Sequence, residues 1–109
     1  MKKDDNIYLE HISEAVSKIE EYLDKMDYEQ FCASTMAIDA VIRQFEIIGE
    51  AANNVSDEFQ QKYPELPWDD MNGMRNQLIH EYFGVDLRVI WRTYKEDLPE
   101  LKEHLKKII

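Results

Sequence analysis

Residues 38–52 read IDAVIRQFEIIGEAA, and the order of polar and apolar residues in this stretch decides the fold. Apolar residues recur mostly every three or four positions, which places them on one face of an α-helix because the helix turns once every 3.6 residues. Extended back along the chain, this stripe consists of Phe31, Ile38, Val41, Ile42, Phe45, Ile48 and Ala52. We predict one long helix that is capped by Asp27 and ends near Asn53 and Asn54.

A second apolar stripe precedes this helix in the chain. It consists of Ile7, Ile12, Ala15, Val16, Ile19, Leu23 and Met26. Asp4 or Asp5 provides the N-cap, because an aspartate side chain accepts hydrogen bonds from the free N–H groups of a first helical turn. We expect both helices to exceed about 20 residues and to pack against each other in antiparallel fashion.

A short connection follows the two long helices. Ser56 is expected to open a short helical piece that runs to Tyr63. The next stretch, residues 63–68, reads YPELPW. It cannot form regular helix, because both prolines lack an N–H group and restrict the residue before them.

The remaining chain is also predicted to be helical. Asp69 or Asp70 is expected to cap a third long helix, Met71 to Phe83. Gly84 is expected to end this helix, because glycine adopts the left-handed conformation that closes many helices.

Two further aspartates mark helix starts near the end of the chain. Asp86 is expected to start a helical piece over residues 87–94, and Asp97, with Pro99 in the first turn, to start the last helix. The predicted fold class is therefore all-α, an up-and-down bundle of four long helices with short helical pieces. We expect residues 1–109 to form a single domain.

The composition excludes several classes of protein. The 109 residues are 44% apolar and 33% charged, with three glycines, three prolines and one cysteine. Such a chain can bury a core, whereas a single cysteine excludes an intramolecular disulfide and a Cys-rich zinc module. No run approaches the ~20 apolar residues of a membrane span, and the first residues lack the apolar core of a signal peptide. We expect a soluble, cytoplasmic protein.

The charge is unevenly distributed along the chain. The formal net charge is −10, which argues against a broad basic surface for nucleic acid. Residues 1–67 carry 6 Lys/Arg and 15 Asp/Glu, a net charge of −9, whereas residues 68–109 carry 7 and 8, a net charge of −1. A site for an anionic substrate is therefore expected in the second part.

Residues 73–82 contain the side chains that could carry chemistry. Arg75 and His80 are separated by four residues, Asn76 lies between them, and Tyr82 follows two residues after His80. Histidine can accept a proton from the 2′-hydroxyl of RNA or donate one to the leaving 5′-oxygen near neutral pH. Arginine can stabilise the charge of the phosphorane-like transition state. These residue types fit cleavage of RNA without a metal.

Metal sites have no support in the sequence. His11, His80 and His104 are far apart, and no Glu-x-x-His or His-x-x-x-His pair occurs. The sequence also lacks a Gly-rich phosphate loop and a nucleophile elbow. We therefore expect neither a metal nor another cofactor.

Helical geometry sets a condition on the use of Arg75 and His80 together. Positions five apart on an ideal helix point about 140° apart, so the two side chains do not share a face. Asn76 does share a face with His80, because it lies four residues earlier. Either the long arginine reaches around the helix, or a second copy completes the site. We favour a cleft on the two-fold axis of a homodimer.

The motif resembles that of a known group of enzymes. Arg75-Asn76-x-x-x-His80-x-Tyr82 is similar to the Arg-x4-His-x-Tyr motif of HEPN-domain RNases, and the surrounding sequence resembles the HepT-like toxin family over nearly its whole length. The matching blocks are Ile47-Ile-Gly-Glu-Ala51, Tyr63-Pro-Glu-Leu-Pro-Trp68, Met74-Arg-Asn-Gln-Leu-Ile-His80, Tyr82-Phe-Gly-Val-Asp86 and Asp97-Leu-Pro-Glu-Leu101.

This resemblance implies a HEPN-like fold and a specific biological role. The protein is expected to be a homodimeric endoribonuclease and the toxin of a toxin–antitoxin pair, cutting cellular RNA with Arg75 and His80 as catalytic residues and Asn76 and Tyr82 in support. Its expected partner is an MNT-type nucleotidyltransferase antitoxin, which inhibits it by forming a complex and by AMPylating Tyr82.

Each of these residues also has a structural interpretation. His80 could cap or pack near the end of its helix, where a cation is favoured. Arg75 could form an ion pair, for which Asp70, Asp86 and Glu50 are candidate partners. Asn76 could be a surface amide, and Tyr82 a core or interface residue beside apolar neighbours.

The function also has an alternative. The bundle could be a non-catalytic partner subunit of a nucleotidyltransferase that binds nucleotide or substrate, with Arg75 serving only as a phosphate clamp. This alternative predicts no RNA turnover, whereas an enzyme of the HEPN type cleaves RNA in the presence of EDTA.

Overall fold

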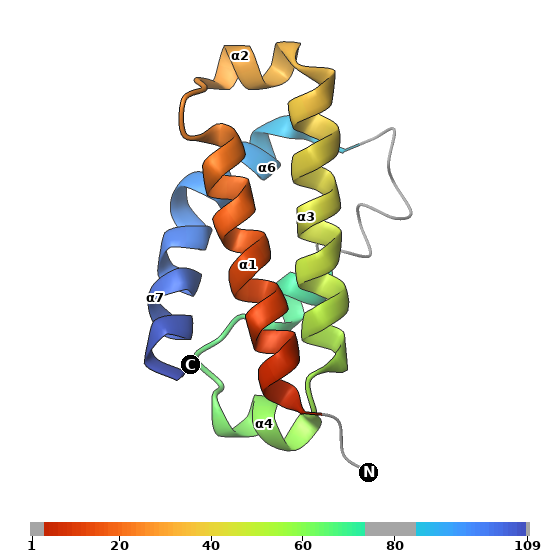
Figure 1. Ribbon diagram of the computed structural model, residues 1–109, viewed down its shortest axis with the longest axis vertical. Coiled ribbons are helices and arrows are strands. Elements are labelled where there is room, and N and C mark those ends of the chain that lie inside the picture. Colours follow the sequence, from red (N-terminus) through yellow and green to blue (C-terminus); the bar gives the residue numbers. More distant parts are fainter. Residues whose placement is uncertain (1–3, 74–84, 109) are drawn as a thin grey trace.

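The computed structural model describes residues 4–73 and 85–108, and these are helical apart from short connections (Figure 1). The elements in chain order are α1 (Asp5–Leu23), α2 (Tyr28–Ala33), α3 (Thr35–Asn54), α4 (Asp57–Lys62), a helical segment over residues 68–73, α6 (Leu87–Arg92), the π-helical turn η2 (Thr93–Asp97) and α7 (Leu98–Ile108). The predicted all-α helical bundle is confirmed.

The helices α1 and α3 lie side by side in antiparallel orientation, with α7 beside α1 (Figure 1). Their facing sides supply most of the core: Leu9, Ile12, Ala15, Val16, Ile19 and Leu23 from α1, and Ala37, Val41, Ile42, Phe45, Ile48, Ala51 and Ala52 from α3. Leu98, Leu101 and Leu105 of α7 also contribute to it. Within the described parts of the chain, no helix has both the length and the apolar character needed to cross a membrane.

The start of α1 differs from the predicted stripe. Asp4 is the N-cap, as predicted, and its side chain accepts a hydrogen bond from the N–H of Asn6. Ile7, however, is 49% exposed, while Leu9 is fully buried. The reason is angular: Ile7 lies five residues, or about 140°, from Ile12, whereas Leu9 lies three residues from it. The helix also ends at Leu23, so it has 19 residues rather than more than 20.

The predicted second helix is divided into α2 and α3. Asp27 caps α2 as predicted, with a reciprocal hydrogen bond to Gln30. The chain then becomes extended at Ser34, whose side chain accepts a hydrogen bond from the N–H of Ala37 and caps α3. The prediction of one continuous helix was therefore wrong. Serine favours this arrangement because its hydroxyl competes with the backbone for the free N–H groups of a first turn.

The connection after α3 is hydrogen-bonded to the start of α1. Ser56 caps α4 as predicted and also donates hydrogen bonds to Asp5, from its N–H over 2.9 Å and from its hydroxyl over 2.8 Å. The carboxylate of Asp5 thus fixes the start of α1 to the start of α4, which lies below α1 in Figure 1. The predicted non-helical connector is confirmed over residues 63–67.

The next helix begins earlier than predicted. Residues 68–73 are helical, and the carbonyl of Pro67 accepts a hydrogen bond from the N–H of Met71. Asp69 and Asp70 therefore lie in the first turn instead of capping it. A residue that follows proline can begin a helix, because the restriction that proline imposes falls on the residue before it. The rest of the predicted third helix, with Gly84, lies outside the described residues.

The final helical region is continuous from Leu87 to Ile108. Asp86 caps α6 as predicted, but Asp97 is not a cap, because it lies within the π-helical turn η2. In this turn the N–H of Leu98 donates to the carbonyl of Thr93, five residues earlier. Pro99 has no N–H with which to satisfy the carbonyl of Lys95, and the wider turn carries the chain past it without a break.

The packing of α1 predicts that two isoleucines of this helix contribute very differently to the free energy of unfolding. Ile19→Ala should lower the free energy of unfolding by about 2–5 kcal/mol, because it leaves a cavity in the core. Ile7→Ala should change it by less than about 1 kcal/mol, since Ile7 is half exposed. Urea denaturation followed by circular dichroism measures both, and equal losses would contradict the packing described.

Candidate functional site

All four residues of the predicted site lie outside the described part of the chain. Arg75, Asn76, His80 and Tyr82 belong to residues 74–84. The structure describes what holds this segment at each end, the helical residues 68–73 before it and the region from Val85 into α6 after it. It also describes a groove beside the first of these ends.

The end that precedes the motif is anchored by Trp68. Its indole Nε1 donates a hydrogen bond to the carbonyl of Tyr63 over 2.9 Å, and its ring meets that of Phe59 edge to face, with centroids 6.4 Å apart. Trp68 is only 9% exposed. Further along, the side-chain amide of Asn72 donates to Asn53 of α3 over 3.2 Å. The helix that leads into Arg75 is thus attached to both α4 and α3.

The helix that follows the motif, α6, is capped by Asp86. Its carboxylate accepts the N–H of Arg88 as a helix cap, and the guanidinium of Arg88 donates to both of its oxygens, over 3.2 and 3.1 Å. The hydrogen bonds from the Arg88 side chain and backbone hold the pKa of Asp86 below its usual value. Of the three carboxylates considered as partners of Arg75, Asp86 is therefore already occupied. Asp70 and Glu50 are exposed.

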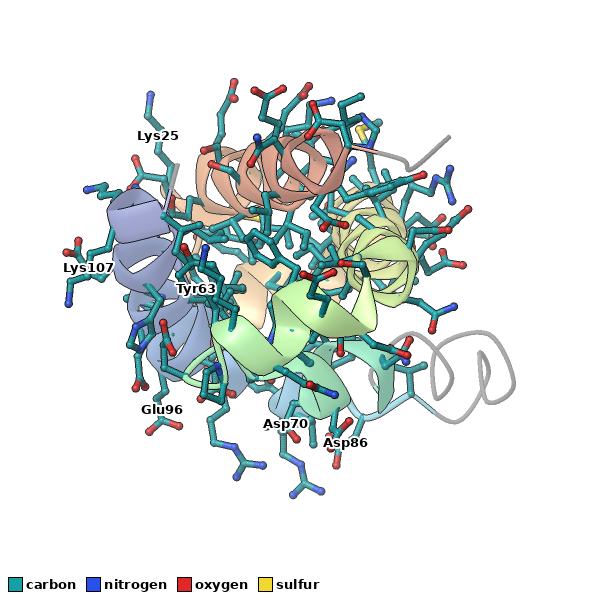
Figure 2. The ribbon with its side chains drawn as sticks, turned by 90° about the horizontal axis from the view of Figure 1, so that it is seen from below. Lys25, Tyr63, Asp70, Asp86, Glu96 and Lys107 are labelled. Atoms are coloured by element: carbon teal, nitrogen blue, oxygen red, sulfur yellow. The ribbon has the colours of Figure 1, made fainter. Side chains whose placement is uncertain are left out.

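A groove of about 680 Å³ runs between the helix that precedes the motif and the C-terminal helices. Among the described residues it is lined by Phe45 and Ile48 of α3; Glu65, Pro67, Asp69, Asp70, Met71 and Gly73; Val89, Arg92, Thr93 and Asp97; and Leu98, Glu100, Leu101 and His104 of α7. Figure 2 shows the bundle from below, with Asp70 and Asp86 near the same edge of the molecule. Sequence reasoning missed this groove because its walls come from residues up to about 60 positions apart.

Most of the charged residues that line the groove are acidic. Partial loss of solvent raises the pKa of Asp97 above its usual value, and repulsion from the carboxylates of Glu96, Asp70 and Glu100 raises it further. The guanidinium of Arg92 opposes this shift. In the part of the chain that the structure covers, no three His, Cys, Asp or Glu side chains are grouped as they would be around a metal ion.

Two tryptophans anchor the elements on either side of the motif. Besides Trp68, Trp91 packs on Phe31 with ring centroids 5.6 Å apart. Trp91 also contacts Tyr28 and Tyr94 through their rings. These contacts attach α6 to α2 and fix the region that follows the motif.

The fold and the sequence motif together define a class, the all-α bundle of the HEPN type. The family model described as Ribonuclease HepT-like matches residues 12–108. The chain belongs to this HepT-like ribonuclease family and is an endoribonuclease, which is the enzyme class that the sequence predicted.

Several relatives agree with this assignment. A protein of Thermococcus cleftensis named "Probable ribonuclease HepT" is 47% identical over 108 residues, which cover 99% of this chain and 98% of that protein. Two proteins of Methanocaldococcus jannaschii are also similar. One, named "Putative RNase", is 40% identical over 105 residues, 96% of each chain. The other, named "Gamma-glutamylcyclotransferase and putative RNase", is 48% identical, and this chain spans 49% of its length. No solved structure matches the chain.

The raised pKa of Asp97 predicts that the effect of Asp97→Asn on the free energy of unfolding depends on pH. Because the folded protein binds this proton more tightly than the unfolded chain, ionisation of Asp97 lowers the free energy of unfolding as the pH rises above the usual value of 3.8. Asp97→Asn should therefore be slightly more stable than the parent at pH 7, within about 0.5 kcal/mol, and the gain should vanish near pH 3.

Thermal melting at a series of pH values measures this difference. Glu10→Gln on the exposed face of α1 is the control, because it removes a carboxylate that lies outside the groove. A lower stability of Asp97→Asn at neutral pH would contradict the electrostatic account of the groove.

Proposed function

We propose that this endoribonuclease cuts RNA without a metal, with Arg75 and His80 as catalytic residues at a cleft between two copies of the chain. We further propose that it is the toxin of a toxin–antitoxin pair, inhibited by an MNT-type nucleotidyltransferase. The observation that carries the proposal is the motif Arg75-Asn76-x-x-x-His80-x-Tyr82 inside the region matched by the family. In this proposal residues 1–109 act as a single domain in the cytoplasm.

The proposed reaction is an internal displacement at phosphorus. The 2′-oxygen of the substrate attacks the adjacent phosphate, the bond from phosphorus to the 5′-oxygen breaks, and the products carry a 2′,3′-cyclic phosphate and a free 5′-hydroxyl. An imidazole takes the proton of the 2′-hydroxyl or donates one to the 5′-oxygen. The guanidinium of Arg75 binds the scissile phosphate and stabilises the extra charge of the transition state.

A homodimer would satisfy the geometric condition set by the helix. Arg75 and His80 of one copy point about 140° apart on an ideal helix, so a site that uses both gains from a second copy across a two-fold axis. Such a cleft would hold two imidazoles, one to accept a proton and one to donate a proton. Asn76, on the same face as His80, would orient the imidazole or contact the substrate.

The environment of the motif supports a role for Arg75 toward phosphate. Asp86 already accepts two side-chain hydrogen bonds and one backbone hydrogen bond from Arg88, which leaves it less acceptor capacity for Arg75. The described elements on either side of the motif are anchored by Trp68 and Trp91. Precise placement of catalytic groups depends on such support, because small displacements reduce the rate strongly.

Inhibition would act on the same phosphate site. The nucleotidyltransferase would transfer AMP from ATP to the hydroxyl of Tyr82 and release pyrophosphate. A bulky anion two residues from His80 would then block the substrate phosphate sterically and by charge repulsion. Asn76 and Tyr82 thus have supporting roles, and only Tyr82 is the site of modification.

Substitution of the two catalytic residues should abolish RNA cleavage without unfolding the protein. His80→Ala should lower the rate by about 10²–10⁴-fold, as expected for loss of general acid–base catalysis. Arg75→Ala should lower it by about 10²–10³-fold, as expected for loss of transition-state stabilisation. Cleavage of a labelled RNA in excess EDTA, at several pH values around neutrality, measures both effects.

The matched controls are His11→Ala and Lys18→Ala on α1, an exposed imidazole and a partly exposed cation outside the motif. They should retain the parent activity. Equal cleavage by all variants would show that the activity comes from elsewhere, and no cleavage by the parent would favour a non-catalytic partner of a nucleotidyltransferase.

The mass of the protein should report its modification. Co-expression with an MNT-type nucleotidyltransferase should add one or more adenylate units at Tyr82, detected by intact mass and peptide mapping. Tyr82→Phe should gain none, because it lacks the hydroxyl, whereas Tyr22→Phe, at an exposed tyrosine of α1, should be modified like the parent. Modification that persists in Tyr82→Phe would place it on another residue.

A further inference from the structure

Positive charge exceeds negative charge in the stretch that contains the motif and the helix after it. Residues 71–95 carry 4 Lys/Arg and 2 Asp/Glu, a net charge of +2, whereas the rest of the chain carries 9 and 21, a net charge of −12. We propose that the outer face of α6 and η2 binds the phosphates of single-stranded RNA through Arg88, Arg92 and Lys95. The proposal rests on the proposed function and deepens it, because it names where the substrate binds outside the motif.

The three cations lie on one face of the helical region and form what we call the basic ridge. Arg88, Arg92 and Lys95 are spaced by four and three residues, which places them on a common face because a helix turns once every 3.6 residues. All three are exposed, whereas Ile90 is only 1% exposed. The helix rises about 10 Å from Arg88 to Lys95, so the ridge can contact more than one phosphate of a strand.

Two cations of the basic ridge keep their charge available. The ammonium of Lys95 lies over the rings of Trp91 and Tyr94, 5.6 and 5.5 Å from the ring centroids. Aromatic rings attract a cation without neutralising it. Within residues 4–73 and 85–108, neither Lys95 nor Arg92 forms an ion pair with a carboxylate. Both cations can therefore receive a phosphate.

The third cation, Arg88, is paired with Asp86 but has donors left. Its side chain is 80% exposed. Two of its N–H groups donate to the oxygens of Asp86, over 3.2 and 3.1 Å, and a guanidinium has five such groups. The pair holds the guanidinium in place, and the remaining N–H groups can donate to a phosphate.

Carboxylates border the basic ridge on both sides. Arg92 lines the acidic groove together with Asp70. Lys95 lines a second cavity, of about 480 Å³, together with Glu20 and Asp24. These carboxylates repel phosphates, so an RNA strand that binds here is confined to the ridge.

The other group of lysines, on α7, is a poorer site for phosphates. The ammonium groups of Lys102 and Lys106 lie 2.9 and 3.5 Å from carboxylate oxygens of Glu20 and Glu103. Two of the three lysines within residues 102–107 are thus paired, whereas two of the three ridge cations are not. The α7 lysines therefore serve as the control in the test.

The test uses the full chain and a labelled single-stranded 2′-O-methyl RNA of about 12 nucleotides. Methylation of the 2′-oxygen removes the nucleophile, so binding is measured without cleavage. Fluorescence anisotropy in EDTA, between about 50 and 200 mM salt, gives the slope of log K against log salt concentration. For single strands this slope becomes shallower by about 0.7 for each phosphate contact that is lost.

The ridge variant is Arg92→Gln combined with Lys95→Gln, which leaves the pair of Arg88 and Asp86 intact. It should weaken RNA binding about tenfold near 0.1 M salt and make the slope shallower by about 1.4. With a cleavable RNA it should raise KM and leave kcat unchanged, because the ridge binds the substrate and the transition state equally.

The control is Lys106→Gln combined with Lys107→Gln, which removes two exposed cations of α7 and changes the net charge equally. It should keep the affinity and the salt slope of the parent. Circular dichroism melting shows that both variants fold.

Several outcomes would overturn the proposal. Absence of RNA binding by the parent, or equal affinities and slopes of the ridge and control variants, would show that the ridge does not bind phosphates. Equal binding of an oligoglutamate of the same charge would assign the ridge to an acidic protein. A change in oligomeric state of the ridge variant alone would identify an interface between copies.

Failure of this proposal can be told apart from failure of the proposed function. RNA cleavage by the parent, together with unchanged binding by the ridge variant, would refute the ridge and leave catalysis by the motif in place. RNA binding that depends on the ridge, without cleavage of a 2′-hydroxyl RNA, would support the ridge and refute the proposed catalysis.

Discussion

The fold depends on the apolar contact between α1 and α3. Ile12, Ile19 and Val41 are fully buried along this contact, and each such side chain stabilises the folded state by about 1.5–3 kcal/mol relative to an exposed position. The other described elements attach to this pair. α7 lies against α1, where Lys102 also pairs with Glu20, and Asp5 at the start of α1 holds Ser56 at the start of α4.

The described elements on either side of the motif are stabilised by different interactions. Before the motif, the ring of Trp68 packs against Phe59 and its indole N–H donates a hydrogen bond to a backbone carbonyl. After the motif, Asp86 caps α6 and pairs with Arg88, while Trp91 packs α6 against α2. The two attachments differ in their sensitivity to conditions, because salt and low pH weaken an exposed ion pair but leave a buried indole in place.

The acidic character of the protein bears on how a ribonuclease could be controlled. A chain with a net charge of −10 repels RNA over most of its surface, so attraction of substrate has to come from a local group of cations. The same acidity favours association with basic protein partners. Five carboxylates line the groove beside Gly73, which precedes Arg75 by two residues in the chain.

Local chemistry was predictable from the sequence alone. The caps at Asp4, Asp27, Ser56 and Asp86 and the all-α class follow from interactions within a few residues, and the motif with its surrounding blocks pointed to the family. The residues assigned to the motif rest on the sequence, because they lie outside the described part of the chain. The break at Ser34 and the π-helical turn at Asp97 also have local causes, a serine cap and the missing N–H of Pro99, which apolar periodicity does not reveal. Only the tertiary structure decided the groove, because its walls come from residues far apart in the chain that periodicity along one helix cannot bring together.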